Sequence, residues 1–334
     1  MNIADYKGVW VFAEQRDGEL QKVSLELLGK GREIADKLGV ELTALLIGHN
    51  VEGMSKELAA YGADKVLLAD REELAHYSTD GYAKVIADLA NAHKPEIIFI
   101  GATYIGRDLG PRVAAKLSTG LTADCTALDI DPENNNLMMT RPAFGGNLMA
   151  TIVCGDHRPQ MSTVRPGVFE KLPKDDSKVA VVEKANFELS ASDIRTKVLE
   201  VKKIVKEVED IIEADIIVSG GRGVGSKENF AILKELADVL GGSVAGSRAA
   251  VDNGWVDKAV QVGQTGKTVR PTVYVACGIS GAIQHLAGMQ DSNYIIAINK
   301  DADAPIMKAA DVALVGDYQK IVPEMVAQFK AMEK

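Results

Sequence analysis

The stretch DIIVSGGRGVGS, residues 215–226, decides the fold of the second half of the chain. Its first five residues are mostly apolar and predict a buried strand, which leads into a glycine-rich turn and then a helical pattern. TVYVAC, residues 272–277, repeats this arrangement and runs into the turn GISGAIQH, residues 278–285. Two further apolar runs, at 294–299 and 312–315, predict additional strands. This alternation predicts an α/β domain with a parallel sheet.

The first third of the chain follows the same alternation. Its apolar runs predict buried strands at residues 8–13, 41–47, 65–69 and 96–101, with helical patterns between them. From Leu121 the runs are shorter and turn clusters separate them, so we expect an antiparallel extension of this mostly parallel first sheet. Residues 197–213 alternate apolar and charged side chains, and periodicity does not decide between strand and helix. A domain boundary near Lys206 gives an N-terminal α/β domain, 1–205, and a C-terminal α/β domain, 206–334.

Composition and charge restrict the class of protein. The 334 residues are 46% hydrophobic and 25% charged, as in soluble globular proteins. A formal net charge of −9 argues against a nucleic-acid-binding protein, which neutralises phosphates with Lys and Arg. The three cysteines have no spacing that suggests disulfides or zinc, and no apolar run is long enough to span a membrane. Because the opening MNIADYKGVW contains no targeting pattern, we expect a cytoplasmic protein.

Glycine-rich and polar segments follow the strands predicted for the C-terminal domain. In open α/β sheets, ligands bind beyond the carboxyl ends of the strands. The turn at 220–226 combines glycines, which let backbone N–H groups approach a phosphate, with the positive charge of Arg222. The turn at 278–285 has a similar form, and Asn299 and Asp317 follow two other strands. Helix capping explains each of these features alone, whereas several strand ends together favour a bound nucleotide.

Two familiar nucleotide-binding motifs are missing from this domain. The turn at 220–226 has no G-x-G-x-x-G spacing, which argues against a dinucleotide-dependent dehydrogenase. GSRAAVDNGW, residues 246–255, and VQVGQTGKT, residues 260–268, are predicted loops. The second resembles a P-loop, but Gln261 stands where its first glycine is required, and a proline follows too closely for the helix. His285 lies in the first turn of a predicted helix, where a lone histidine is more often structural than functional.

Six collinear motifs of the C-terminal domain resemble those of electron-transfer flavoprotein α subunits. They are SGGRG at Ser219, GSRAAVD at Gly246, QVGQTGKTVRP at Gln261, CGISGAIQHLAGM at Cys277, AINKDADAPI at Ala297, and VGDY near the end. GATYIGRDLGPRVAAKL, TGLTADCT and TRPAFGGNLMATI in the N-terminal domain are also similar to the family, so the resemblance covers nearly the whole chain. It implies a Rossmann-like C-terminal domain that binds FAD, and an N-terminal domain that contacts a smaller β subunit.

The resemblance also implies roles for particular residues. Arg222 and Ser247 would contact the pyrophosphate, and Arg248 would lie over the isoalloxazine ring. Val262, Gly263, Gln264 and Thr265 would line that ring, with the Thr265 hydroxyl at flavin N5. The turn of Ser280, Gly281, Ala282, Ile283, Gln284 and His285 would hold phosphate at its start and bring His285 near the flavin C2 carbonyl. Asn299 and Asp317, with the adjoining Tyr318, would lie at the adenosine end.

These roles agree with flavin chemistry, in which the protein positions and tunes the cofactor. Reduction places negative charge on the N1–C2=O edge of the ring, and a guanidinium or imidazolium nearby raises the potential for the first electron. At an effective dielectric constant of 20, one charge at 4 Å is worth about 4 kcal/mol, or roughly 170 mV as an upper bound. The set contains no evident general base or nucleophile, which favours an electron carrier over an enzyme.

The motifs look like those of anaerobic bacterial members of the family. Some of these pair with a butyryl-CoA-type acyl-CoA dehydrogenase, carry a second FAD in the β subunit, and divide the electrons of NADH between ferredoxin and an enoyl-CoA. A non-bifurcating shuttle with AMP in the β subunit is the alternative within the family. Outside the family, a nucleotide-dependent dehydrogenase and an ATP-sensing module remain. In the second, the turn at Ile105 would accept a phosphate, although helix capping explains that turn more simply.

Overall fold

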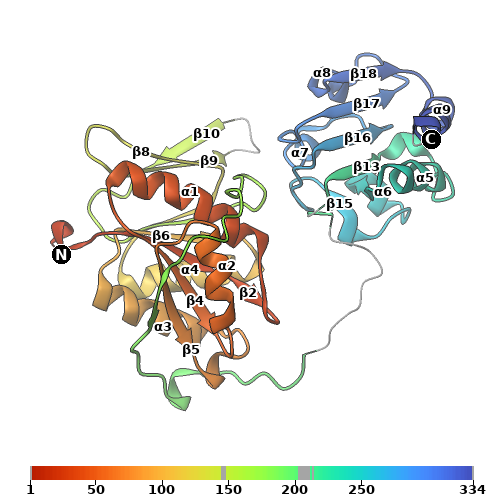
Figure 1. Cartoon of the computed structure of the whole chain (residues 1–334). Helices are drawn as coiled ribbons and strands as arrows, with labels where there is room; N and C mark the ends of the chain where they lie inside the picture. The colour runs from red at the N-terminus through yellow and green to blue at the C-terminus, as the bar shows by residue number, and fades with distance from the viewer. Residues whose placement is uncertain (1, 144–147, 202–210, 213, 333–334) are drawn as a thin grey trace. The chain divides into compact units, whose positions relative to one another are not determined.

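The computed structural model describes residues 2–143, 148–201, 211–212 and 214–332. The chain divides into two compact units, Met1–Lys202 and Lys203–Lys334, and each is an α/β structure with its own cores (Figure 1). Within the segment 197–213, residues 197–201 form neither helix nor strand, and most of the remainder lies outside the described residues. In the part of the chain that is described, no helix is both long and apolar enough to cross a membrane.

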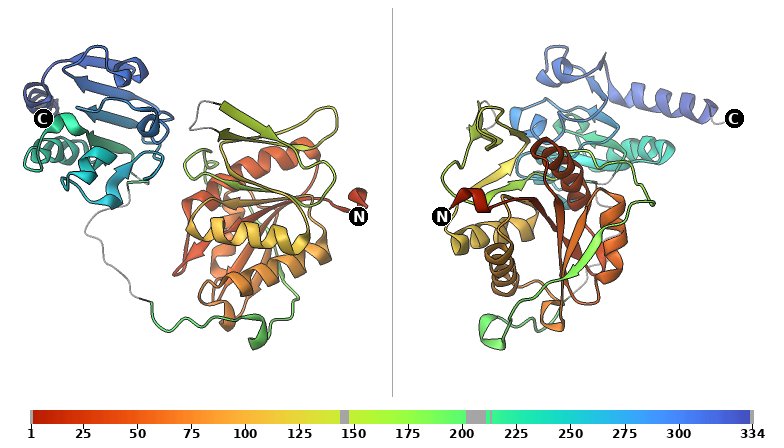
Figure 2. Two further views of the ribbon diagram at one scale, coloured as in Figure 1. Left: turned by 180° about the vertical axis from the view of Figure 1, so that it is seen from behind. Right: turned by 60° about the vertical axis from the view of Figure 1, so that its left-hand side comes forward.

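A seven-stranded parallel sheet forms the N-terminal unit. Its strands lie in the order β12 (Val181–Lys184), β5 (Lys65–Asp70), β4 (Leu42–Gly48), β1 (Val9–Ala13), β6 (Ile97–Gly101), β11 (Gln160–Val164) and β7 (Leu121–Cys125). Alternate residues of β1 enter two different cores. Helices α1 (Lys22–Leu38) and α2 (Ser55–Ala60) cover one face, and α3 (Thr79–His93) and α4 (Tyr104–Leu117) cover the other (Figure 2).

The predicted antiparallel extension of this sheet is wrong in two respects. Strands β8 (Ala127–Ile130), β9 (Leu137–Ala143) and β10 (Leu148–Ile152) form a separate antiparallel sheet. β11 lies parallel between β6 and β7, inside the main sheet. The sequence does not indicate this interior position, because Gln160 and Ser162 are polar although both are fully buried. The Gln160 side chain is accommodated there by accepting a hydrogen bond from the Leu137 N–H at 2.9 Å.

The C-terminal unit contains a six-stranded parallel sheet. Its strands lie in the order β15 (Gln261–Val262), β14 (Ser243–Ser247), β13 (Ile216–Gly220), β16 (Val273–Cys277), β17 (Ile295–Asn299) and β18 (Val312–Val315). The chain adds strands on one side of β13 and then on the other, so the order reverses between β13 and β16. Helices α5 (Phe230–Leu240) and α9 (Tyr318–Met332) pack on one face, and α7 (Ile283–Leu286) and α8 (Pro305–Ala309) contribute to the opposite core.

The segment 246–255, predicted as a loop, instead contains the end of β14 and the short helix α6 (Arg248–Asp252). Ser247 is the N-cap of this helix, since its hydroxyl accepts a hydrogen bond from the Ala250 N–H at 3.4 Å. Short elements complete the fold: strands β2 (Gln15–Arg16) and β3 (Glu19–Leu20), and 3₁₀ helices at Ile3–Asp5, Glu52–Met54, Glu72–Leu74, Ala191–Asp193, Arg222–Val224 and Lys258–Val260.

Candidate functional site

A cavity of about 880 Å³ lies at the carboxyl ends of the strands of the C-terminal unit. Residues at or directly after the ends of five strands line it, namely Gly221, Ser247, Gly263, Gly278 and Asn299. The cavity therefore spans the point between β13 and β16 where the strand order reverses, which is where open α/β sheets bind ligands. Its volume is within the range of cofactor pockets.

The turns after β13 and β16 touch through their backbones at the cavity. The N–H of Gly221 donates to the Cys277 carbonyl and that of Gly223 donates to the Gly278 carbonyl, both at 2.9 Å. A Cβ atom on Gly221 would lie 2.3 Å from the Gly278 carbonyl oxygen, and one on Gly223 would lie 2.8 Å from the Gly278 Cα. Only glycine allows this approach, so the glycine-rich turns shape the wall of the cavity at the switch point.

Two arginines bring positive charge to the cavity. Arg222 directly follows the Gly221 turn, and Arg248 is the first residue of α6, where its Nε lies 3.4 Å from Asp252 Oδ2. Both arginine side chains are exposed, so both guanidinium groups are accessible to a ligand in the cavity. Next to Arg248, the Ser247 hydroxyl uses its oxygen to cap α6 and keeps its proton for another acceptor.

The turn Val262–Thr265 is held against α7 by backbone contacts. The Gln264 N–H donates to the Gln284 carbonyl at 2.7 Å, and a Cβ atom on Gly263 would lie 2.8 Å from the same oxygen. Gly263 has φ +138°, a conformation that other residues rarely adopt. The Thr265 hydroxyl accepts a hydrogen bond from Gln261 Nε2 at 3.0 Å. Because its oxygen accepts there, its proton can be donated to a ligand in the cavity.

His285, on α7, is a buried member of the cavity wall, with 7% of its surface exposed. Its Nε2 lies 3.0 Å from the hydroxyl of Tyr274, which is fully buried. Nδ1 is buried and has no hydrogen-bond partner among the described residues. Burial lowers the pKa of His285 to about 4, and the Val262 backbone offsets only part of this effect. The ring is therefore neutral at pH 7.

The cavity brings together twelve of the sixteen residues predicted to bind a cofactor: Arg222, Ser247, Arg248, Val262, Gly263, Gln264, Thr265, Ser280, Ala282, Gln284, His285 and Asn299. The Asn299 side chain is already engaged by the protein, since its amide donates to the Ile279 carbonyl at 2.8 Å and its oxygen accepts from the Asp301 N–H at 3.0 Å. These bonds tie the end of β17 to the turn after β16.

The other four predicted residues do not line the cavity: Gly281, Ile283, Asp317 and Tyr318. Asp317 forms an ion pair with Lys300 at 3.0 Å, and that contact lowers the pKa of its carboxyl. The Tyr318 hydroxyl is directed to the protein, because it donates to the Val224 carbonyl at 2.8 Å. Tyr318 thereby supports the turn after β13 from behind.

Ten further residues line the wall and were not predicted individually as binding residues: Gly221, Gly223, Ala249, Asp252, Asn253, Gln261, Gly278, Ile279, Asp301 and Ala304. Four of these, Gly221, Gly223, Gly278 and Ile279, lie in the two glycine-containing turns that the sequence predicts to approach a phosphate. Most of the ten directly adjoin predicted residues at strand ends, so the strand-end rule could have found them. Asp252 and Asn253 are different, because they reach the cavity only through the α6 helix, which the sequence did not predict. Among the described residues, no cluster of three or more potential metal ligands is present.

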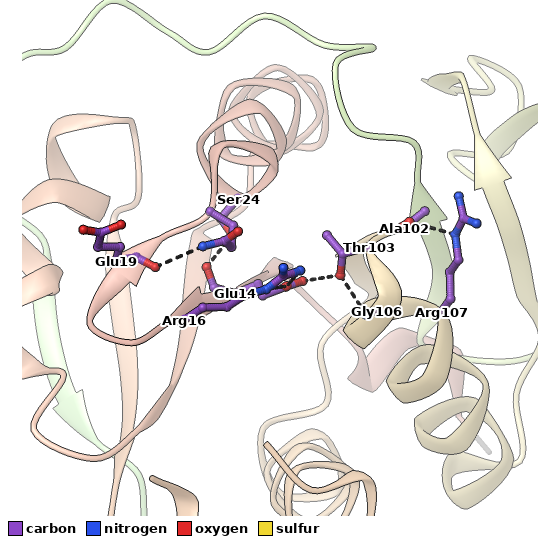
Figure 3. A network of polar contacts seen from close by, with 9 residues as sticks. Glu14, Arg16, Glu19, Ser24, Ala102, Thr103, Gly106 and Arg107 are labelled. Carbon is purple, nitrogen blue, oxygen red and sulfur yellow. Dashed lines mark hydrogen bonds and ion pairs between the residues drawn. The ribbon is translucent and has the colours of Figure 1, made fainter. Parts of the chain in front are cut away.

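The N-terminal sheet has a switch point of its own, between β1 and β6, where nucleotide binding at the Ile105 turn was an alternative. Thr103 caps α4 there by accepting a hydrogen bond from the Gly106 N–H at 3.0 Å, and it donates to Glu14 Oε2 at 2.6 Å (Figure 3). Glu14 is 1% exposed and pairs with Arg16 at 2.6 Å. A phosphate at this helix terminus would meet a buried carboxylate, so these contacts favour helix capping over nucleotide binding.

Comparison with known proteins covers both units. The family model described as the electron transfer flavoprotein domain matches residues 9–190, and the one described as the electron transfer flavoprotein FAD-binding domain matches residues 210–290. The chain is 74% identical over 333 residues to the electron transfer flavoprotein subunit alpha of Clostridium acetobutylicum, with 99% of each chain covered. It is 69% identical over 330 residues to Protein FixB of Clostridium saccharobutylicum, covering 99% of this chain and 98% of the relative. It is also 51% identical over 356 aligned positions to the acryloyl-CoA reductase electron transfer subunit beta of Anaerotignum propionicum, covering 98% and 97%.

Proposed function

The chain belongs to the electron transfer flavoprotein family as an α subunit, and on this premise we propose that the cavity of its C-terminal unit holds FAD. FAD is the cofactor of this domain family. When bound, it supplies one-electron and two-electron transfer, which no side chain of the cavity provides. The observation that carries the placement is one cavity that reaches five strand ends across the switch point, as an extended dinucleotide requires.

The residues of the cavity fit such a ligand in three respects. The glycine turns at Gly221 and Gly278 allow close approach of a phosphate to the backbone. The guanidinium groups of Arg222 and Arg248 can neutralise its charge. Nδ1 of His285 is a buried polar atom without a partner among the described residues, and a ligand group would satisfy it.

We assign the pyrophosphate to Arg222, the Ser247 hydroxyl and the Ser280 turn, which meet where β13, β14 and β16 end. The isoalloxazine ring is assigned to the Val262–Thr265 turn and His285. At this end the Thr265 hydroxyl donates a hydrogen bond, and His285 presents a neutral ring edge. Arg248 supplies a permanent positive charge beside the ring.

Asn299 and Asp317 were predicted at the adenosine end, and we retain Asn299 there with a smaller role. Its amide already bonds the protein, so its contribution is to fix the turn that faces the ligand. Asp317 would act from outside the lining residues, through its ion pair with Lys300. Substituting Asp317 should therefore weaken FAD binding less than substituting Arg222.

We propose that the chain works as an electron carrier in a heterodimer with the β subunit of its family, which the N-terminal unit contacts. Its residues bind and orient the cofactor, which itself carries the electrons. A relative with 51% identity is named an electron transfer subunit of acryloyl-CoA reductase. That name supports an acyl-CoA dehydrogenase of the butyryl-CoA type as the redox partner.

A finer proposal concerns electron bifurcation. We propose that the heterodimer carries a second FAD in the β subunit and divides the electrons of NADH between ferredoxin and the acyl-CoA dehydrogenase. High identity to proteins of two clostridia supports this proposal. The competing proposal is a simple shuttle with AMP in the β subunit.

Counting the bound nucleotides tests both the placement of FAD in this chain and the proposal of electron bifurcation. The heterodimer is purified, its visible absorption spectrum is recorded, and the released nucleotides are identified by chromatography. Two FAD molecules per dimer are expected for the bifurcating form, whereas one FAD with one AMP would leave a simple shuttle. Absence of flavin even after FAD is added would refute the placement of FAD in this chain and revive the dehydrogenase alternative.

A further inference from the structure

Tyr274 lies on β16, and its hydroxyl contacts His285 in the wall of the cavity and also interacts with the Ser219 side chain. Its side chain is fully buried, and its hydroxyl lies 3.0 Å from Nε2 of His285. The two ring centroids are 6.2 Å apart and the rings are tilted by 60°. Tyr274 is not itself a lining residue, so through this pair it can act on a ligand by way of His285.

The partner of one imidazole nitrogen determines where a neutral ring carries its proton. Burial raises the pKa of Tyr274, so its hydroxyl stays protonated and is a ready donor. If that hydroxyl donates to Nε2, Nε2 is the acceptor and the single N–H of the ring is on Nδ1. Nδ1 is the atom that is buried without a partner in the described structure. A donor is thus available at Nδ1, where the Val262 backbone raises the pKa of the ring but no regular hydrogen bond forms among the described residues.

We propose that Tyr274 is a positioning residue of the FAD site, which donates to Nε2 of His285 and thereby presents the Nδ1–H of that ring to an acceptor on the bound flavin. This inference rests on the proposed placement of FAD. A hydrogen bond to a charged acceptor is stronger than one to a neutral acceptor. The Nδ1–H therefore favours the flavin after it has gained negative charge, and Tyr274 raises the reduction potential without touching the cofactor.

The substitution Tyr274→Phe removes the hydroxyl and keeps the ring. In the FAD-free chain, ¹⁵N NMR of the imidazole nitrogens should show His285 with its proton on Nδ1, assigned by the loss of the signals in His285→Ala. In Tyr274→Phe the proton should redistribute toward Nε2. In the FAD-loaded heterodimer, the same substitution should make the first reduction about tenfold less favourable, which is a fall of about 59 mV for one electron.

Two comparisons separate positioning from a general loss of stability. Tyr82→Phe removes a matched buried hydroxyl from the N-terminal unit, where it donates to the Leu74 carbonyl at 3.0 Å, and should leave both readouts unchanged. In a His285→Ala background, Tyr274→Phe should cause no further fall in potential. The inference is overturned if Tyr274→Phe keeps the Nδ1–H signal, or if the potential falls equally with and without His285. Failure of the unsubstituted heterodimer to bind FAD would refute the placement of the cofactor. The NMR measurement on the FAD-free chain would still decide which nitrogen of His285 carries the proton.

Discussion

Protonation of His285 should destabilise the FAD-free chain as the pH falls. The imidazole is buried, its one hydrogen-bonded nitrogen faces a tyrosine, and its pKa is lowered from 6.5 to about 4 because burial disfavours the charged form. In the unfolded chain the same ring takes up its proton near pH 6.5. Between these two values the unfolded state binds more protons than the folded state, so stability falls with decreasing pH.

The size of the effect follows from the two pKa values. Each unit of pKa difference is worth about 1.4 kcal/mol, so the full loss approaches about 3 kcal/mol below pH 4. From pH 7 to pH 5 the expected loss from this group alone is about 2 kcal/mol. Above pH 6.5 the ring is neutral in both states, and this group should cause little further change.

Urea unfolding can measure this loss in the C-terminal unit. The chain has two tryptophans, and in a Trp10→Phe background only Trp255 of the C-terminal unit reports by fluorescence. Other groups also titrate in this range, so the measurement is the difference between this chain and its His285→Gln form. That difference in unfolding free energy should shrink by about 2 kcal/mol between pH 7 and pH 5. A difference that stays constant, or grows on acidification, would refute a buried neutral His285.

Three further changes test other parts of the structure. Gly221→Ala should abolish FAD retention because the new Cβ atom would lie 2.3 Å from the Gly278 carbonyl oxygen. Gly53→Ala is the control, since no atom lies within 4 Å of its Cβ. Equal flavin content in both variants would contradict the close backbone contact between the turns after β13 and β16. Arg248→Ala should lower the potential of the first electron in a redox titration, and an unchanged potential would place Arg248 away from the flavin. Glu14→Gln should lower the unfolding free energy of the N-terminal unit by about 1.5–3 kcal/mol, because a buried ionised acceptor is lost, and an unaltered urea midpoint would show that this contact contributes nothing.

The sequence predicts parallel strands well where apolar residues are continuous, as in β1, β4 and β16, because strands buried on both faces need such runs. It fails at β11, where Gln160, Ser162 and Thr163 are buried polar residues. Gln160 and Thr163 accept hydrogen bonds from distant parts of the chain, from the N–H groups of Leu137 and Asp124, and no local pattern reports them. The antiparallel strands are predicted correctly in kind but not in the sheet they join.

Some residues of the candidate site can likewise be predicted from the sequence, and others cannot. Glycines and polar residues that follow strands can be placed at one edge of a sheet from sequence alone, which is why the turns at 220–226 and 278–285 are predicted to lie together. The role of His285 comes from the family resemblance. Tyr274 could not be found by this rule, because it lies inside a strand and reads as an ordinary core residue. Its hydroxyl matters only because the fold brings it to His285, and that pairing depends on how α7 packs against the sheet.

The cavity contains a permanent cation, Arg248, and a neutral group that can become a cation, His285. The guanidinium of Arg248 is exposed and charged at any working pH. Charging His285 at pH 7 costs about 4 kcal/mol, because its pKa of about 4 lies three units lower. A negative charge beside the ring offsets at most about 4 kcal/mol of this, taking 4 Å and an effective dielectric constant of 20. His285 is consequently able to take up a proton at Nε2 only when negative charge forms beside it, and the Tyr274 hydroxyl then changes from donor to acceptor, whereas Arg248 is charged at all times. The loss of potential in Arg248→Ala should be the same at pH 6 and pH 8, and the loss in His285→Ala should be larger at pH 6. Equal pH profiles for the two variants would contradict this division.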